Sequence, residues 1–413
     1  MNVMVLTPYL PHARVGHGGG TAVRDLVRAL ARSHRVRVVA LMRPGEQARL
    51  DDVRALGAEL NVIPYLDGTA RGPELAALVA ARGAAWVRSR RSGYPAYVQK
   101  YRTGDLARRV VAAARDFRPD AIQVEYLQMA LLARDLRRWR DRESPATRLV
   151  LNSHELGSVP RERRAAAAGT AGERRREEAE AARWRRLQVD ATAWADTTLC
   201  VTPGDHALYA AMGGRNLRIM PLGMDTATVA PVWTPAPGAP PRFLFVASWG
   251  HRPNVLAAGL LLDRVWPRVR AARPDAQLVL AGRGSDGFLA ARPADGVTAL
   301  GFVDDLAPLY REATLVAAPL AEGGGIKIKI LEAMARGVPV VTTTVGAEGI
   351  TDGDDAAAVI APPDERFADA MLATATDAPL LTALSQRGRA LIERKFSWTG
   401  IAAALGRIYA GEA

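Results

Sequence analysis

Cysteine is almost absent from this chain of 413 residues. The single Cys200 excludes an intramolecular disulfide, which favours a reducing, cytoplasmic setting. No run approaches the roughly 18 apolar residues of a membrane span. The opening MNVMVLTPYL lacks the basic region and long apolar core of a signal peptide, and it is typical of a first strand. The six histidines and the lone cysteine form no metal-ligand spacing, so the sequence predicts no metal site.

Lysine is nearly as scarce. Of the 55 lysines and arginines, the only lysines are Lys100, Lys327, Lys329 and Lys395. Two of them fall beside a glycine run at 323–325. Because a compact ammonium binds phosphate as a point charge, whereas guanidinium is a planar fork, these two lysines indicate an anion site. Chance, together with a solvated helix face, is the alternative.

The positive charge is confined to the front half. Residues 1–225 hold 37 Lys+Arg against 24 Asp+Glu, and residues 226–413 hold 18 against 19, which gives the net +12. Such an excess fits peripheral contact with the inner face of a membrane, or a phosphorylated acceptor. It equally fits a solvated face in an arginine-biased chain. Aromatic residues make up only 6% and no nucleic-acid module is present, so we expect no nucleic-acid partner.

Buried strand-like runs alternate with helical patterns twice along the chain. Residues 226–241 contain five prolines and no charge, and they separate the two halves as a linker. This alternation predicts two α/β domains with parallel sheets. Ligands bind such sheets at the carboxyl ends of the strands, where we therefore expect the chemistry.

The most informative stretch is EGGGIKIKILEAMARGVPVV at 322–341. We expect Gly323, Gly324 and Gly325 to open a short helix, where unpaired backbone N–H groups and the lack of side chains admit a phosphate or diphosphate. Lys327 and Lys329 would add charge. The alternative is a tight strand-to-helix turn without a ligand.

With this stretch, the chain resembles the retaining glycosyltransferases of family 4. The resemblance also covers 1–41, 201–225, 243–284 and 299–350, and the final FSWTGIAAALGRIYAG is similar to the family's C-terminal helix. It implies the GT-B fold, an α/β architecture of two Rossmann-like, doubly wound domains that face a central cleft. Residues 1–228, joined by the helix at 396–413, would be the acceptor-side domain, and residues 240–395 the donor-binding domain.

The resemblance implies a metal-independent transfer from a GDP- or UDP-sugar, with no separate cofactor. The acceptor would be a polysaccharide or lipid-linked intermediate, or a small metabolite such as an antibiotic precursor. By resemblance, Glu332 binds the ribose. The catalytic candidates are His154 and Glu322 at the transferring sugar, and Lys329 at the leaving diphosphate. The other donor-binding positions that it implies are Gly18, Gly19 and Gly20 in a first-domain loop, Ser248, Arg252, Gly301, Phe302, Val303, the glycines at 323–325, Lys327 and Lys329.

Several residues keep a second interpretation. Nine residues lie between Glu322 and Glu332, two more than in the family's usual pair, so Glu322 is equally an ordinary loop carboxylate. Glu332 could instead pair with Lys329 along a helix. Asp352 and Asp354 form a D-x-D that we interpret as a turn rather than a metal site. A sugar epimerase or phosphorylase of the same fold, and a non-catalytic nucleotide-sugar-binding protein, remain the alternative functions.

Overall fold

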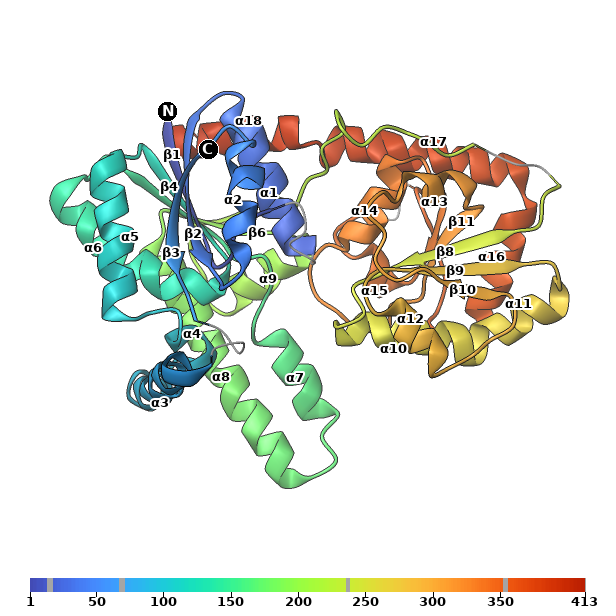
Figure 1. Cartoon of the computed structure of the whole chain (residues 1–413), viewed down its shortest axis with the longest axis horizontal. Coiled ribbons are helices and arrows are strands. Elements are labelled where there is room, and N and C mark those ends of the chain that lie inside the picture. Colours follow the sequence, from blue (N-terminus) through green and yellow to red (C-terminus); the bar gives the residue numbers. More distant parts are fainter. Residues whose placement is uncertain (13–17, 67–70, 235–237, 352–355, 413) are drawn as a thin grey trace. The chain divides into compact units, whose positions relative to one another are not determined.

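The computed structural model describes residues 1–12, 18–66, 71–234, 238–351 and 356–412. The chain folds into two compact units. Unit 1 comprises Met1–Pro221 with Ile401–Ala413, and unit 2 comprises Leu222–Gly400. Each unit is a parallel sheet with helices packed against it (Figure 1), which confirms the predicted pair of Rossmann-like α/β domains.

The sheet of unit 1 has seven parallel strands in the order β3-β2-β1-β4-β5-β6-β7. Its central strands are runs of buried residues rather than alternating ones, because helices cover both faces. The strands are β1 (Asn2–Thr7), β2 (Arg35–Met42), β3 (Glu59–Pro64), β4 (Ala121–Glu125), β5 (Arg148–Asn152), β6 (Thr197–Cys200) and β7 (Leu217–Ile219).

The helices of unit 1 include a long antiparallel pair, α7 and α8, that extends away from the sheet (Figure 1). A capping box between Thr170 and Glu173 starts α8. The helices are α1 (Gly18–Ala31), α2 (Leu50–Arg54), α3 (Gly72–Ser92), α4 (Ala96–Gln99), α5 (Gly104–Phe117), α6 (Ala130–Glu143), α7 (Val159–Ala166), α8 (Ala171–Trp194), α9 (Pro203–Ala211) and α18 (Trp398–Ala410), with short 3-10 turns η1 (Glu46–Arg49) and η2 (Leu127–Met129).

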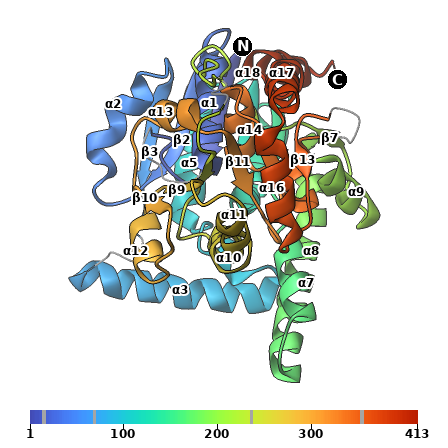
Figure 2. The ribbon, with the colours of Figure 1, turned by 90° about the vertical axis from the view of Figure 1, so that its right-hand side faces the viewer.

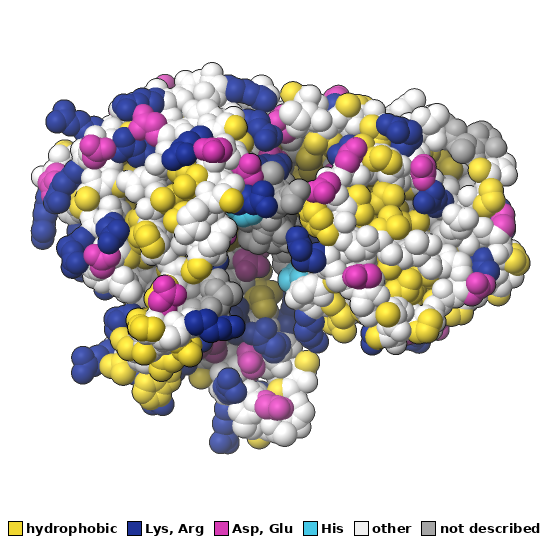
Figure 3. Space-filling view, in the orientation of Figure 1, with side chains coloured by type: hydrophobic (Ala, Val, Ile, Leu, Met, Phe, Trp, Pro, Cys, Tyr) yellow, Lys and Arg dark blue, Asp and Glu magenta, His cyan; other side chains and the backbone are white. Residues whose placement is uncertain are grey.

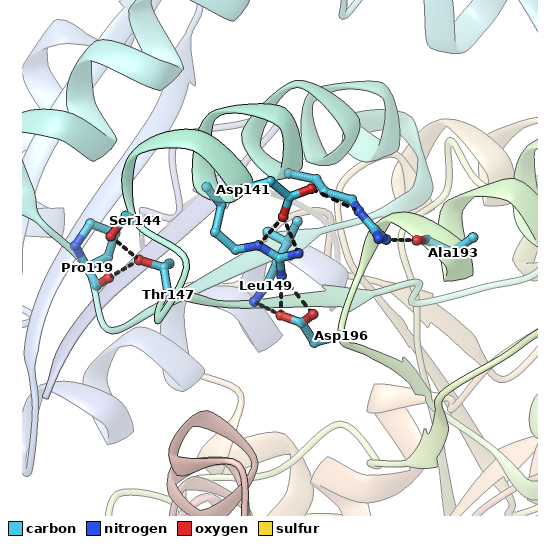
Figure 4. Close-up of polar contacts among 9 residues, drawn as sticks. Pro119, Asp141, Ser144, Thr147, Leu149, Ala193 and Asp196 are labelled. Carbon is cyan, nitrogen blue, oxygen red and sulfur yellow. Dashed lines mark hydrogen bonds and ion pairs between the residues drawn. The ribbon is translucent and has the colours of Figure 1, made fainter.

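A polar cluster ties together the amino ends of β5 and β6. Asp196 accepts hydrogen bonds from the backbone N–H of Leu149 (2.8 Å) and from the Arg140 guanidinium (2.6 and 2.7 Å), as Figure 4 shows. The Thr147 hydroxyl donates to the Pro119 carbonyl (2.8 Å). A shallow hollow lies at these residues, but its charged groups already pair with one another. We assign this cluster to stability, because it lies at the edge of the sheet opposite to the carboxyl ends.

The sheet of unit 2 has six parallel strands in the order β10-β9-β8-β11-β12-β13. They are β8 (Arg242–Val246), β9 (Gln277–Ala281), β10 (Val297–Ala299), β11 (Leu315–Ala318), β12 (Val340–Thr342) and β13 (Val359–Ile360). Figure 2 faces this unit and shows its helices around the sheet. They are α10 (Arg252–Leu260), a π-helical turn η3 (Leu261–Val265), α11 (Trp266–Ala272), α12 (Ser285–Ala290), α13 (Ala307–Glu312), α14 (Ile328–Ala335), α15 (Thr344–Ala347), α16 (Arg366–Thr376) and α17 (Ala378–Lys395).

Each sheet has one point at which the strand order reverses. In unit 1 it lies between β1 and β4, and in unit 2 between β8 and β11. Loops from neighbouring strands diverge there and leave a crevice at the carboxyl ends, where ligands of this architecture bind. These two places are therefore where the functional residues are sought. Among the described residues, no helix is both long enough and apolar enough to cross a membrane.

Candidate functional site

In unit 1, aromatic side chains from three neighbouring strands meet at the strand-order reversal. Tyr9 follows β1, Tyr126 follows β4 and His154 follows β5. The Tyr126 ring stacks on the His154 imidazole, with ring centroids 3.6 Å apart and planes 5° apart. Tyr9 meets Tyr126 edge-on, with centroids 5.2 Å apart. The crevice expected from the topology therefore has an aromatic wall that includes the predicted His154.

The backbone at this wall is strained. Tyr126 has a φ of 71° and His154 a φ of 57°, in the left-handed region that side chains other than glycine rarely adopt. Such conformations cost on the order of 1–3 kcal/mol each and cluster at functional sites. His154 is also only 7% exposed, so its position is fixed by packing as well as by stacking.

A buried carboxylate holds His154 from behind. The Nε2 atom of His154 forms a hydrogen bond with Oε2 of Glu125, the last residue of β4, which is fully buried. The same oxygen accepts a hydrogen bond from the Asn152 amide (3.1 Å), and the other oxygen accepts one from the Gln123 amide. Glu125 thus accepts three hydrogen bonds, which offset the cost of burying it.

The chain of hydrogen bonds continues to the end of the protein. The hydroxyl of Tyr409, in α18, donates to Oε1 of Gln123. Burial, with a contribution from Glu125, raises the pKa of Tyr409 well above its usual range, so the phenol stays protonated as a donor. Within unit 1, the C-terminal helix therefore reaches His154 through Gln123 and Glu125.

The sequence suggested that the glycines at 18–20 lie in a loop, but the structure places them in a helix. They form the first turn of α1. A Cβ atom at Gly19 would lie 2.1 Å from the Tyr126 hydroxyl, so this turn can approach the aromatic wall only as glycine. Glu155, beside His154, is exposed and adds no contact to this cluster.

In unit 2, the central feature is a buried lysine, Lys329, that has no counter-ion in the described part of the chain. Lys329 lies in the first turn of α14, and its ammonium donates to the side-chain oxygen of Asn254 in α10. It also lies 5.1 Å from the centre of the Phe245 ring. Among the described residues, no carboxylate comes within ion-pair distance of Lys329. Burial, and to a lesser degree the charge of Lys327, lowers the pKa of Lys329 to about 7.

Lys327 lies differently from its neighbour. Its ammonium donates to the Gly325 carbonyl (2.7 Å) and pairs with Glu348 (3.1 Å). These contacts hold Lys327 in an extended conformation, with φ −91° and ψ 92°. The prediction that the glycines open the helix is therefore wrong, since α14 begins only at Ile328.

The glycine run forms the loop between β11 and α14. Gly323 has a φ of 129° and Gly325 a φ of 66°, which only glycine adopts readily. Among the described residues, the backbone N–H groups of Ile328 and Lys329 find no hydrogen-bond partner. The first turn of α14 thus offers unpaired donors beside the Lys329 ammonium, an arrangement suited to an anion.

Glu332 lies one turn further along α14. Its carboxylate pairs with Arg336 at 3.4 Å, and the predicted alternative pair with Lys329 is not formed. The buried Tyr310 phenol lies beside it, and burial, with a contribution from Glu332, raises the pKa of Tyr310. About a quarter of the Glu332 side chain (23%) stays exposed, so it remains accessible to a ligand.

Glu322 and Arg252 face each other across the strand-order reversal of unit 2. The Arg252 guanidinium, at the start of α10, bonds both carboxylate oxygens of Glu322 (3.0 and 3.2 Å). The arginine is 67% exposed, so this pair stabilises the fold little. Ser248 is exposed after β8, and its carbonyl accepts a hydrogen bond from Asn254 (2.8 Å). These predicted residues therefore share one edge with Lys329.

The predicted base-binding loop lies after β10. Gly301 has a φ of 64°, and both of its backbone polar atoms are engaged, with Ser285 (2.9 Å) and Gly282 (2.7 Å). Phe302 is 44% exposed, and the Arg283 guanidinium lies over its ring at 4.8 Å. Val303 is half-buried beside it. The loop thus presents an aromatic ring with a cation above it.

No metal centre is found among the residues that the structure describes, where no three His, Cys, Asp or Glu side chains come together to hold an ion. Asp352 and Asp354 of the D-x-D lie outside the described residues.

Sequence reasoning missed Glu125, Tyr126, Asn254 and Arg283. Each directly follows or ends a strand, or begins the next helix, at the carboxyl edge of its sheet. The position of Glu125 at the end of a strand that is otherwise apolar except for Gln123 was the available signal. Its partner His154 lies 29 positions away, which the sequence pattern does not link.

Comparison with known families agrees with this arrangement. A family model described as "Glycosyl transferase 4-like domain" matches residues 17–225, and one described as "Glycosyl transferases group 1" matches residues 240–377. The first of these models covers just over half of the chain, which therefore belongs to the glycosyl transferase 4-like family.

Similar proteins extend this assignment. The lipopolysaccharide core biosynthesis mannosyltransferase LpsB of Rhizobium meliloti is 31% identical over 45% of this chain and 58% of that protein. The phosphatidyl-myo-inositol mannosyltransferase of Mycobacterium leprae is 28% identical over 46% of this chain and 51% of that protein. The matched segment spans about half the length of these curated relatives.

Solved structures share the fold over the whole chain. Sucrose-phosphate synthase from Thermosynechococcus elongatus superposes with a TM-score of 0.69 at 18% identity, covering 100% of this chain and 99% of that chain. Anabaena HepE in complex with UDP-glucose superposes with a TM-score of 0.63 at 14% identity, covering 100% of both chains. These neighbours are GT-B glycosyltransferases, so the two-domain GT-B fold is shown.

The scarcity of lysine makes the state of Lys329 directly measurable. Reductive methylation with ¹³C-formaldehyde labels the four lysines and the N-terminus, and each gives its own NMR titration. We expect one lysine to titrate near pH 7 instead of near the ordinary 10.5, and Lys329→Arg to remove that resonance.

Because the folded pKa of Lys329 is lower than its unfolded pKa, the unfolded chain binds more protons between these two values. The penalty that Lys329 places on folding is therefore full below pH 7 and fades as the pH rises towards 10.5. Four lysines that all titrate above pH 9 would contradict the assignment.

Proposed function

We propose that this protein is a retaining, metal-independent glycosyltransferase that transfers a sugar from a nucleotide-diphosphate sugar to an acceptor. One observation carries the proposal: among the described residues, Lys329 has no carboxylate partner, and it lies beside unpaired N–H groups at the start of α14. A desolvated ammonium is costly unless a ligand supplies the opposite charge. A diphosphate leaving group supplies that charge, and its neutralisation is the main electrostatic task of glycosyl transfer.

In this proposal, the donor binds along the edge of unit 2. Lys329 and the N–H groups of Ile328 and Lys329 neutralise the diphosphate, whereas Lys327 serves mainly to shape the loop through Glu348. Glu332 accepts hydrogen bonds from the ribose hydroxyls. The base lies at Phe302. It forms hydrogen bonds with the backbone of Phe302 and Val303, because the backbone N–H and carbonyl of Gly301 already bond Ser285 and Gly282.

The residues of unit 1 contact the transferring sugar. Glu125 accepts the Nε2 proton of His154, which fixes the tautomer of the imidazole and leaves Nδ1 to bond a sugar hydroxyl. Tyr126 holds the ring plane by stacking. Glu322 remains a candidate for the donor sugar's hydroxyls once it leaves Arg252. Retention of the anomeric configuration rests on the resemblance of the stretch at 323–334 to family 4.

The base, sugar and acceptor are proposed by class. A GDP- or UDP-sugar is supported by the UDP-glucose in the HepE structure, and a lipid-linked or polysaccharide acceptor by the names of the mannosyltransferase relatives. A small specialised metabolite stays among the acceptor classes. We also propose a cytoplasmic protein whose basic unit 1 contacts the inner face of the membrane, which the charge excess of residues 1–225 supports.

The role of Glu332 is tested by ribose discrimination. We expect wild-type protein to bind UDP or GDP more tightly than the 2′-deoxy nucleotide, because a carboxylate accepts the hydroxyl proton. Glu332→Gln should weaken the binding of the ribonucleotide by about tenfold, which corresponds to the loss of a charged hydrogen bond. It should also remove most of the preference for the ribonucleotide over the 2′-deoxy nucleotide. Calorimetry measures both affinities. Glu393→Gln is the matched control, since Glu393 also forms an i,i+4 pair with an arginine but lies on α17. Discrimination that survives in Glu332→Gln would reject the ribose role.

The buried chain behind His154 is tested by separating turnover from donor binding. Glu125→Gln keeps the shape but leaves a single acceptor oxygen for His154, Asn152 and Gln123, which disturbs the hydrogen bond that sets the tautomer of His154. Turnover should fall by about 10- to 100-fold while nucleotide affinity is unchanged, as loss of a partner that orients a functional histidine typically does. Tyr409→Phe should give a smaller loss of the same kind, because it removes only the hydroxyl that orients Gln123. Wild-type turnover in Glu125→Gln would overturn this role.

A further inference from the structure

A cavity of about 300 Å³ lies in unit 1, apart from the aromatic wall at His154. It is bounded by the end of β3, by α3 and by the segment that connects α4 with α5. Arg43, which follows β2, also lines it. The cavity therefore opens at the carboxyl ends of β2 and β3, on the same edge of the sheet as Tyr126 and His154.

Positive charge dominates this cavity. Among the described residues that line it, Arg43, Arg82 and Lys100 stand against one carboxylate, Asp105. That carboxylate is already paired with Arg108 (3.1 Å) and Arg109 (2.8 Å). Across the described ranges, no carboxylate lies within ion-pair distance of Arg82 or Lys100. Among the described residues, Arg82 and Lys100 therefore have no carboxylate that would balance their charge.

Lys100 is the most informative of the three. It is one of four lysines in a chain that otherwise uses arginine. Its ammonium lies 4.0 Å from the centre of the Tyr97 ring and 4.8 Å from that of Tyr101. Burial, followed by the charges of Arg82 and Arg43, lowers the pKa of Lys100. The lysine is thus half-buried and repelled by its neighbours, a state that a bound anion would relieve.

The remaining walls are apolar and aromatic. Tyr65 and Tyr101 stack with ring centroids 5.4 Å apart and planes 7° apart. Ile63 and Leu78 are buried beside them. A ligand that fills this cavity therefore needs an anionic group for the cations and an apolar or flat body for the tyrosines and aliphatic side chains.

The outer side of α3 continues this apolar surface. Leu75, Val79 and Trp86 share one face of the helix and are 46–60% exposed. In Figure 3, hydrophobic side chains gather where α3 lies in Figure 1. A ligand with a long apolar body thus has surface to follow beyond the cavity.

We propose that this cavity binds the phosphate group of an acceptor whose adjoining body is apolar, with Lys100 and Arg82 on the phosphate and Tyr65 and Tyr101 against the body. A phosphate monoester matches several point charges better than a carboxylate does. The assignment to an acceptor rests on the proposed function, whereas the binding of such an anion does not. The ligand is either a soluble phosphate ester or the phosphate headgroup of a lipid.

Calorimetry with geranyl phosphate, a monomeric apolar phosphate monoester, tests the site. Geraniol and inorganic phosphate are the probes that lack one half of the chemistry, and both should bind at least about tenfold more weakly. Lys100→Met should weaken the binding of geranyl phosphate by about tenfold, as the loss of a charged hydrogen bond does. Lys100→Arg should restore most of this affinity. Arg82→Met should also weaken binding. Arg91→Met, which removes the same charge from α3 outside the cavity, should leave it unchanged.

A second arm separates the two ligand sources. Co-sedimentation with phosphatidylcholine vesicles that contain phosphatidic acid is measured for the same variants. If Lys100→Met weakens the binding of geranyl phosphate in solution, the cavity is assigned to a soluble phosphate ester. If Lys100→Met weakens only the binding to vesicles, the cavity is assigned to a lipid headgroup. Either result supports the site. Geranyl phosphate and vesicle binding that both ignore Lys100→Met and Arg82→Met would overturn it.

Nucleotide binding, measured on the same samples, separates this proposal from the donor site. Variants of Lys100 that lose geranyl phosphate but keep UDP or GDP binding support the cavity as a separate site. Wild-type protein that binds geranyl phosphate but no nucleotide would refute the donor site and leave the cavity as an anion site.

Discussion

An ammonium group at the carboxyl edge of unit 2, with no counter-ion among the residues that the structure describes, is the constraint on which the proposed donor site depends. Lys329 has a neutral amide, Asn254, and an aromatic ring, Phe245, where a structural lysine would have a carboxylate. Its neighbour Lys327 shows the difference, since it pairs with Glu348 and shapes the glycine loop. Two lysines in one motif thus have different contacts: Lys327 pairs with a carboxylate, and we propose that Lys329 binds the ligand.

The candidate site residues of unit 1 are held by a buried carboxylate, Glu125, whereas the central group in unit 2 is the ammonium of Lys329. Glu125 is surrounded by hydrogen-bond donors and fixes His154, while the stacked Tyr126 fixes the ring plane. Because Tyr409 joins this network through Gln123, the C-terminal helix is part of the support of the site as well as of the fold. In both units these groups lie at the reversal of strand order, so one topological rule positions both.

The sequence predicted the two α/β domains, because apolar runs and the glycines and prolines that separate them are local signals. His154 and Glu332 were singled out through the family resemblance and the lysines through their scarcity, and the structure places all of them near the carboxyl edges of the two sheets. Sequence reasoning missed Glu125 and Tyr409 because their partners lie far away in the chain, at separations of 29 and 286 positions. It misplaced the start of α14 because the ion pair of Lys327 with Glu348, a tertiary contact, keeps Lys327 extended and delays the helix to Ile328.

The most direct test of the central claim is the proton balance of nucleotide binding. At pH 8 the free protein holds Lys329 mostly neutral, since its pKa is about 7. A bound diphosphate favours the charged form and raises that pKa. Calorimetric titration of UDP and GDP in two buffers of different ionisation enthalpy should therefore show uptake of about one proton on binding, and none in Lys329→Met. Nucleotide binding without proton uptake by the wild-type protein would contradict the account.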